Sequence, residues 1–96
     1  MRRHARTDAN HADIVKALRQ CGCTVQSLAS LGHGVPDLLV APKHGPMLLM
    51  EIKDGSQPPS KQKLTPDEAE WHDKWNTRVH KITSVTDALS AVGVGE

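Results

Sequence analysis

Two acidic residues and a lysine stand where two short apolar segments meet polar sequence. Asp37 precedes the apolar run 38–41, and Glu51 and Lys53 lie at the end of the apolar run 47–52. Charged side chains rarely border a buried strand unless they are paired or bind a metal ion. Two neighbouring carboxylates suit Mg²⁺, and a lysine beside them can orient an attacking water. The three residues therefore suit metal-assisted hydrolysis of a phosphodiester. The alternatives are that Asp37 is a turn residue after Pro36 and that Glu51 and Lys53 form a solvated pair on the strand.

The two apolar runs are expected to form an antiparallel hairpin. Residues 43–46, Lys-His-Gly-Pro, are typical of a turn, and the continuous apolar runs predict strands buried on both faces. In such a hairpin the start of one strand lies beside the end of the other, so Asp37 would meet Glu51 and Lys53 at one edge of the sheet. Ile52 would point into the core, and its carbonyl oxygen is a further candidate metal ligand.

The segments around the hairpin alternate between helix and strand patterns. Apolar residues recur at helical spacing over 8–21, a short strand pattern follows at 24–28, and 29–35 is a glycine-containing loop. Thr65, Pro66 and Glu68 carry the signature of a helix start. A strand at 78–82 and a helix capped by Ser84 complete the chain. This order predicts an α/β fold.

The aromatic residues are few, and their place is predicted from their spacing. Trp71 and Trp75 lie four residues apart on the predicted helix, so they share one face. The chain has no Phe and no Tyr. We therefore expect both Trp side chains to supply much of the core, with stacking on nucleic-acid bases as the alternative.

The composition limits the other classes of function. Ninety-six residues fit one domain over 1–96, and no apolar run approaches the roughly 18 residues that a membrane span needs. No apolar stretch follows the basic N-terminus, so we expect no secretory signal and a cytoplasmic location. Cys21 and Cys23 match no zinc-site spacing and are expected to be reduced thiols. His72 and His80 are expected on the surface.

The formal net charge is +1, which by itself does not indicate a nucleic-acid binder. Basic residues nevertheless outnumber acidic ones over 1–35 and 43–63, whereas acidic residues prevail over 64–96. A basic face can therefore form from the first two-thirds of the chain. The candidate phosphate contacts lie in a flexible basic arm over 1–7, in the loop ahead of Asp37 and in the loop after Lys53. They are Arg2, Arg3, Arg6, His33, Lys61 and Lys63, and the alternative for each is a solvated side chain.

The order Pro36-Asp37 followed by Glu51-Ile52-Lys53 matches the signature of PD-(D/E)xK nucleases. With the flanking segments 34–40, 49–55 and 64–71, nearly the whole chain resembles a small stand-alone VRR-NUC domain of the phage type. The resemblance implies a restriction-endonuclease-like αβββαβ core with a mixed central sheet flanked by helices. It also implies dependence on Mg²⁺ or Mn²⁺, cleavage of branched DNA, a homodimer, and a phage or prophage gene expressed in a bacterial host.

Carried over by position, the resemblance makes Asp37 and Glu51 the metal carboxylates and Lys53 the catalytic lysine. The chain is then expected to be an endonuclease that cleaves branched, flap or four-way-junction (Holliday junction) DNA. Selection by DNA shape is expected, because so small a domain offers little surface for reading bases. One alternative is a weakly active or inactive DNA-binding or assembly module with the same fold. Another is a restriction subunit, which would need a separate specificity segment.

The chain departs from the family pattern at two places. The family often has a glutamate in the first helix that reaches the metal, and here the candidates are Asp13, Asn10 and His11. The family also tends to have a glutamine three residues before the helix tryptophan, where this chain has Glu68. Glu68 is therefore either a capping residue alone or a group that supports the metal site from the side.

Overall fold

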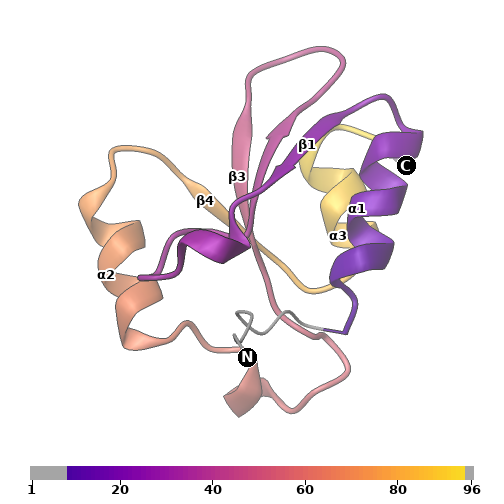
Figure 1. The fold of residues 1–96 in the computed structure, drawn as a ribbon. Coiled ribbons are helices and arrows are strands. Elements are labelled where there is room, and N and C mark those ends of the chain that lie inside the picture. Colours follow the sequence, from indigo (N-terminus) through magenta and orange to yellow (C-terminus); the bar gives the residue numbers. More distant parts are fainter. Residues whose placement is uncertain (1–8, 95–96) are drawn as a thin grey trace.

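The computed structural model describes residues 9–94 (Figure 1). Within that part of the chain no helix is long and apolar enough to cross a membrane. The predicted basic arm over 1–7 lies outside the described residues, and with it lie Arg2, Arg3 and Arg6.

A four-stranded mixed sheet forms the centre of the structure. Its strands are β1 (Thr24–Ser27), β2 (Leu38–Ala41), β3 (Leu48–Ile52) and β4 (Val79–Ile82), in the order β1-β2-β3-β4. The pairs β1–β2 and β2–β3 are antiparallel, whereas β4 runs parallel to β3. The parallel return of β4 needs a crossover connection, and the segment containing the second helix supplies it.

Helices flank the sheet on both sides. The first helix α1 (His11–Gln20) and the last helix α3 (Val85–Ala91) cover one face, and α2 (Pro66–Lys74) lies on the other (Figure 1). Two short 3₁₀ turns, η1 (Ala29–Leu31) and η2 (Pro59–Lys61), lie in the connections. The predicted α/β class, with a mixed central sheet flanked by helices, is confirmed.

The core lies between the sheet and the α1–α3 pair. Alternate residues of a strand point to one face, and here that face carries branched and thioether side chains that meet the apolar stripe of α1. Removing each such side chain from water contributes about 1.5–3 kcal/mol. The buried apolar residues are Ile14, Leu18, Cys23, Val25, Leu38, Val40, Met50, Ile52, Ile82 and Ala88.

The opposite face of the sheet differs from the prediction. Leu39 and Leu49 are only half-buried there, so the apolar side chains of the hairpin are less buried on this face than on the core face. Trp75 is 54% exposed and Trp71 is half-buried. Their rings stack on each other at 4.6 Å instead of filling the core, because aliphatic side chains already fill the space beneath α1 and α3. The prediction of a tryptophan core was therefore wrong.

The first helix begins later than its apolar pattern suggests. Asn10 occupies the N-cap position of α1, but its side chain makes no capping hydrogen bond. Instead, its Nδ2 donates to the carbonyl oxygens of Lys53 at 3.2 Å and Thr83 at 3.0 Å. Asn10 thus ties the start of α1 to the segments that follow β3 and β4.

The start of α2 follows its sequence signature. Thr65 Oγ1 accepts a hydrogen bond from the Glu68 amide at 3.2 Å, and Glu68 Oε1 accepts one from the Thr65 amide at 2.9 Å. This is the predicted capping box, with Pro66 in the first turn. Since α2 has no fully buried residue, these local bonds matter for its position. Gly34 adds a close contact, because a Cβ at this residue would overlap the backbone carbonyl of Asp67.

Replacing Gly34 by Ala is therefore expected to displace α2. Gly34 has φ +82° and Gly45 has φ +104°, but a Cβ at Gly45 would have nothing within 4 Å. Gly45→Ala should then cost only the backbone penalty, about 1–2 kcal/mol, whereas Gly34→Ala should cost at least about 1 kcal/mol more. Thermal unfolding measures the difference, and equal melting temperatures for the two variants would contradict the described packing of α2.

Candidate functional site

The register of the hairpin places two carboxylates side by side. Leu38 of β2 pairs with Met50 of β3, so the next residues outward, Asp37 and Glu51, face each other. The Ile52 amide donates to Asp37 Oδ2 at 2.8 Å, which holds the Asp37 side chain against the end of β3. The Glu51 side chain is only 3% exposed. The predicted meeting of these two acids at one edge of the hairpin is what the structure describes.

The surroundings of the Glu51 carboxyl group strongly favour its protonated form. Burial, the neighbouring charge of Asp37 and a side-chain hydrogen bond with Asp37 raise the pKa of Glu51 to about 10, and the charge of Glu68 adds to the effect. The positive charge of Lys53 opposes it without cancelling it. Without a cation, Glu51 is therefore protonated at neutral pH. A divalent cation would stabilise the ionised form of the pair.

Lys53 lies beside these acids and is held by the second helix. Its Nζ is 2.7 Å from Glu68 Oε1, and the two side chains are 11% and 18% exposed. Burial tends to raise the pKa of Glu68, but hydrogen bonds from Lys53 and from the Thr65 amide outweigh burial and lower it. Glu68 is thus an ionised partner of Lys53 as well as a helix cap.

His72 is a site residue that the sequence interpretation missed. It follows Glu68 by one helical turn, its side chain is 17% exposed, and its Nε2 lies 4.0 Å from Glu51 Oε1. Burial lowers the pKa of His72, although the charge of Glu68 acts in the opposite direction. The signal available in the sequence was the spacing of four residues from Glu68, which places both side chains on one face of α2.

An open cleft of about 570 Å³ connects these groups to solvent. It unites the ends of the hairpin, the start of α2 and the loop between β3 and α2. The residues that line it are Ala9, Asp37, Glu51, Ile52, Lys53, Asp54, Gln57, Lys61, Thr65 and Glu68.

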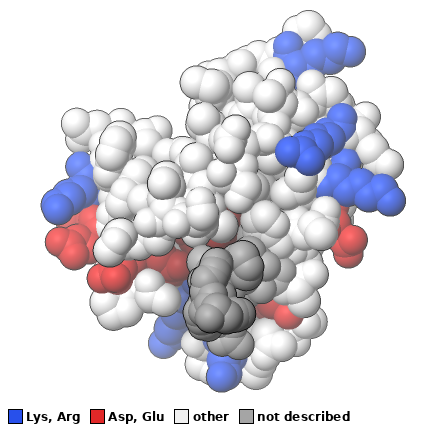
Figure 2. Space-filling view, viewed as in Figure 1, with Lys and Arg blue, Asp and Glu red and all other residues white. Residues whose placement is uncertain are grey.

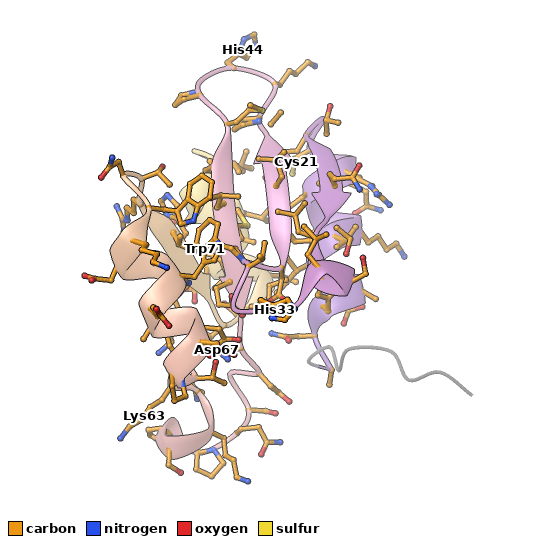
Figure 3. All side chains as sticks on the ribbon, turned by 60° about the vertical axis from the view of Figure 1, so that its left-hand side comes forward. Cys21, His33, His44, Lys63, Asp67 and Trp71 are labelled. Carbon is orange, nitrogen blue, oxygen red and sulfur yellow. The ribbon has the colours of Figure 1, made fainter. Side chains whose placement is uncertain are left out.

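The remaining predicted site residues lie in different places. Lys61 lines the cleft, whereas Lys63 is exposed near the start of α2 and does not line it (Figure 3). His33 lies beside α2, in a separate hollow shared with Trp71 (Figure 3). Asp13 is exposed on α1 and does not line the cleft.

The charged side chains are unevenly distributed on the surface. Acidic side chains gather over α2 and toward the centre of the face in Figure 2, whereas basic side chains lie mainly on the α1 side and along the lower end of the molecule. A polyanion would be repelled from the outer surface of α2 and attracted to the basic areas. The cleft lies between these two kinds of surface.

The chemistry of the pair fits a hard divalent cation. Asp37 and Glu51 present two carboxylates to an open cleft, and burial beside Asp37 raises the pKa of Glu51, which a further positive charge would lower. Among residues 9–94 no three His, Cys, Asp or Glu side chains surround one point. Mg²⁺ commonly binds through one or two carboxylates and keeps several waters. The candidate donors here are the carboxylates of Asp37 and Glu51 and the carbonyl oxygen of Ile52.

Comparison with known proteins bears on the fold. The chain is similar to a solved structure of a VRR-NUC domain, with a TM-score of 0.60 and 22% sequence identity over 84% of this chain and 91% of the other. No protein-family profile and no curated protein sequence matches. The VRR-NUC-like fold predicted from the sequence is therefore confirmed by structural similarity.

The raised pKa of Glu51 predicts an unusual dependence of stability on pH in the absence of cations. The folded protein keeps this proton up to about pH 10, whereas the unfolded chain releases it near the ordinary value of 4.5. The free energy of unfolding should therefore fall as pH rises between these values. Glu51→Gln should remove this slope and raise the melting temperature at pH 8 by roughly 4–8 °C for each 1 kcal/mol recovered.

Thermal unfolding in EDTA between pH 5 and 9 tests this expectation. Glu70→Gln is the matched control, because the Glu70 side chain is 69% exposed and remote from the pair. An unchanged pH slope in Glu51→Gln, or a slope lost equally in Glu70→Gln, would contradict the described environment of Glu51.

Proposed function

We propose that this protein is a metal-dependent DNA endonuclease that hydrolyses phosphodiester bonds. The observation that carries the proposal is the forced pairing of Asp37 with Glu51 in an open cleft that also contains Lys53. The VRR-NUC-like fold supports the proposal, because this is a nuclease-type fold. Perturbed carboxylates that converge with a lysine in a cleft are typical of active sites.

The roles of the side chains follow from their positions. Asp37 and Glu51, with the carbonyl oxygen of Ile52, would hold Mg²⁺ or Mn²⁺. When bound there, such a cation lowers the pKa of water and neutralises charge on the phosphoryl group. Lys53 would orient the attacking water and stabilise charge on the phosphoryl oxygens. Glu68 keeps the Lys53 ammonium in place through the 2.7 Å contact.

We infer that branched DNA, such as a flap or a four-way junction, is the substrate. The cleft is open and has a volume of about 570 Å³, so it suits a phosphate backbone presented at a bend or branch better than a long sequence of bases. Phosphate contacts would come from the cleft, the neighbouring loops and the N-terminal arm, and each would make binding more sensitive to salt. The residues proposed for these contacts are Arg2, Arg3, Arg6, His33, Lys61 and Lys63.

The proposal extends to a homodimer that acts in the bacterial cytoplasm. A twofold dimer would set two clefts against one branched substrate. The exposed side chains of Leu31, Met47 and Trp75 offer apolar surface for such a contact. Cys21 and Cys23 are free thiols, which suits a reducing compartment, and the resemblance to phage-type VRR-NUC domains extends the proposal to a phage or prophage gene.

The nuclease proposal predicts metal-dependent cleavage. The protein should cut at least one of flap, splayed-arm and four-way-junction DNA in Mg²⁺ or Mn²⁺, and EDTA should abolish the reaction. Asp37→Ala and Lys53→Ala should each lower the rate by at least about 100-fold, because each removes a group that acts on the reacting phosphate. Glu70→Ala serves as the acidic control, because the Glu70 side chain is 69% exposed, and it should cleave normally.

Two results would contradict this proposal. Cleavage undiminished in Asp37→Ala would refute the site, and no cleavage of any substrate with any metal would refute the enzyme. The second candidate function, a DNA-binding module without activity, is favoured by the ion pair that neutralises Lys53 with Glu68. Retained binding of branched DNA in the absence of any cleavage would support that module.

The proposed dimer has its own measurement. Light scattering at micromolar concentration should give about twice the 10.5 kDa of one chain. Trp75→Lys should shift the population toward the monomer, because it replaces an exposed apolar side chain with a charged one. A mass of one chain across the concentration range would refute the homodimer.

A further inference from the structure

Two buried polar atoms without partners face each other behind the cleft. Glu51 Oε1 and His72 Nε2 are both inaccessible to solvent, and neither has a hydrogen-bond partner among residues 9–94. They lie 4.0 Å apart, beyond hydrogen-bonding distance. Leaving a buried polar atom unpaired costs about 1–3 kcal/mol. A pair of such atoms directed at each other indicates an interaction that forms in another state of the site.

We propose that His72 is a positioning residue for Glu51. Its Nε2–H donates a hydrogen bond to Oε1 of the ionised carboxylate and keeps the other carboxylate oxygen turned toward Asp37. This inference deepens the proposed function, because it rests on a divalent cation at the Asp37–Glu51 pair. A modest rotation of the two side chains brings the 4.0 Å separation to the roughly 2.9 Å of an N–H···O bond.

The geometry favours this role over direct coordination of the cation. His72 does not line the cleft, whereas Glu51 does, so the imidazole approaches Glu51 from the side of α2. A cation between the two unpaired atoms would be cut off from solvent. Mg²⁺ keeps several waters when it binds to carboxylates. A hydrogen bond from behind the carboxylate fits the enclosed space, and a hydrated ion does not.

The second helix holds the imidazole in this position. The edge of Trp71 meets the His72 ring at 80°, with the ring centroids 6.4 Å apart. One turn earlier, Glu68 caps the helix and binds Lys53. The same face of α2 therefore carries one partner for Lys53 and one for Glu51, and both active-site groups depend on the placement of one helix.

Cation affinity gives a direct readout of this role. Groups that hydrogen-bond a metal-ligating side chain typically contribute 10–100-fold in metal affinity. His72→Met should weaken Mn²⁺ binding, measured by the electron paramagnetic resonance of free Mn²⁺, by about tenfold or more. His72→Gln, which has nearly the shape of the Met variant but keeps an N–H donor, should bind Mn²⁺ almost as tightly as the natural protein. His80→Met, on the α3 side of the sheet, is the control and should leave affinity unchanged.

The outcomes separate this inference from the nuclease proposal. If Asp37→Asn weakens Mn²⁺ binding but His72→Met and His72→Gln bind alike, the positioning role is wrong and the cation site stands. If bound Mn²⁺ shows hyperfine coupling to a directly coordinated nitrogen that His72→Met removes, His72 is a ligand and the positioning role is again wrong. If the natural protein binds no Mn²⁺, both proposals fail together.

Discussion

The antiparallel register of β2 and β3 is the constraint on which the site depends. Because Leu38 pairs with Met50, the register places Asp37 opposite Glu51 at the end of the hairpin. Ionising a nearly buried carboxyl group beside a second carboxylate is energetically unfavourable, and the pKa of Glu51 rises to about 10 as a result. Two other groups act on this pair: Lys53 supplies positive charge, and His72 Nε2 lies 4.0 Å from the buried Oε1 of Glu51. We propose that this cost in stability serves the binding of a cation.

Stability and site assembly are divided between the two faces of the sheet. The layer beneath α1 and α3 is aliphatic and closed, and it supplies the burial that folds the chain. The layer beneath α2 is thin, and α2 is placed by its capping box, the Gly34 contact and the Lys53–Glu68 ion pair. Because α2 carries both Glu68 and His72, the polar contacts that dock the helix also complete the cleft. Because α2 is held by polar contacts rather than by a packed apolar layer, the cleft on this side of the sheet stays open to solvent.

The sequence alone predicted the parts of the molecule that depend on local rules. Two continuous apolar runs and the turn residues between them predicted the hairpin, and the hairpin brought Asp37 to Glu51. The Thr65–Glu68 spacing predicted the start of α2. The failures concern neighbours across layers. Periodicity placed Trp71 and Trp75 on one face of α2. It did not reveal that this face is only partly covered, with the two rings stacked on each other and Trp75 exposed. His72 was missed for the same reason, because only the docking of α2 brings it to Glu51.

We propose that a divalent cation binds to Asp37 and Glu51 and displaces the proton of the Glu51 carboxyl group. Calorimetric titration of Mn²⁺ at pH 7.5, repeated in two buffers with different ionisation enthalpies, measures the protons released on binding. Because Glu51 is protonated in the cation-free protein, we expect about one proton released per cation bound. Binding with no proton release, or no binding at all, would contradict the account.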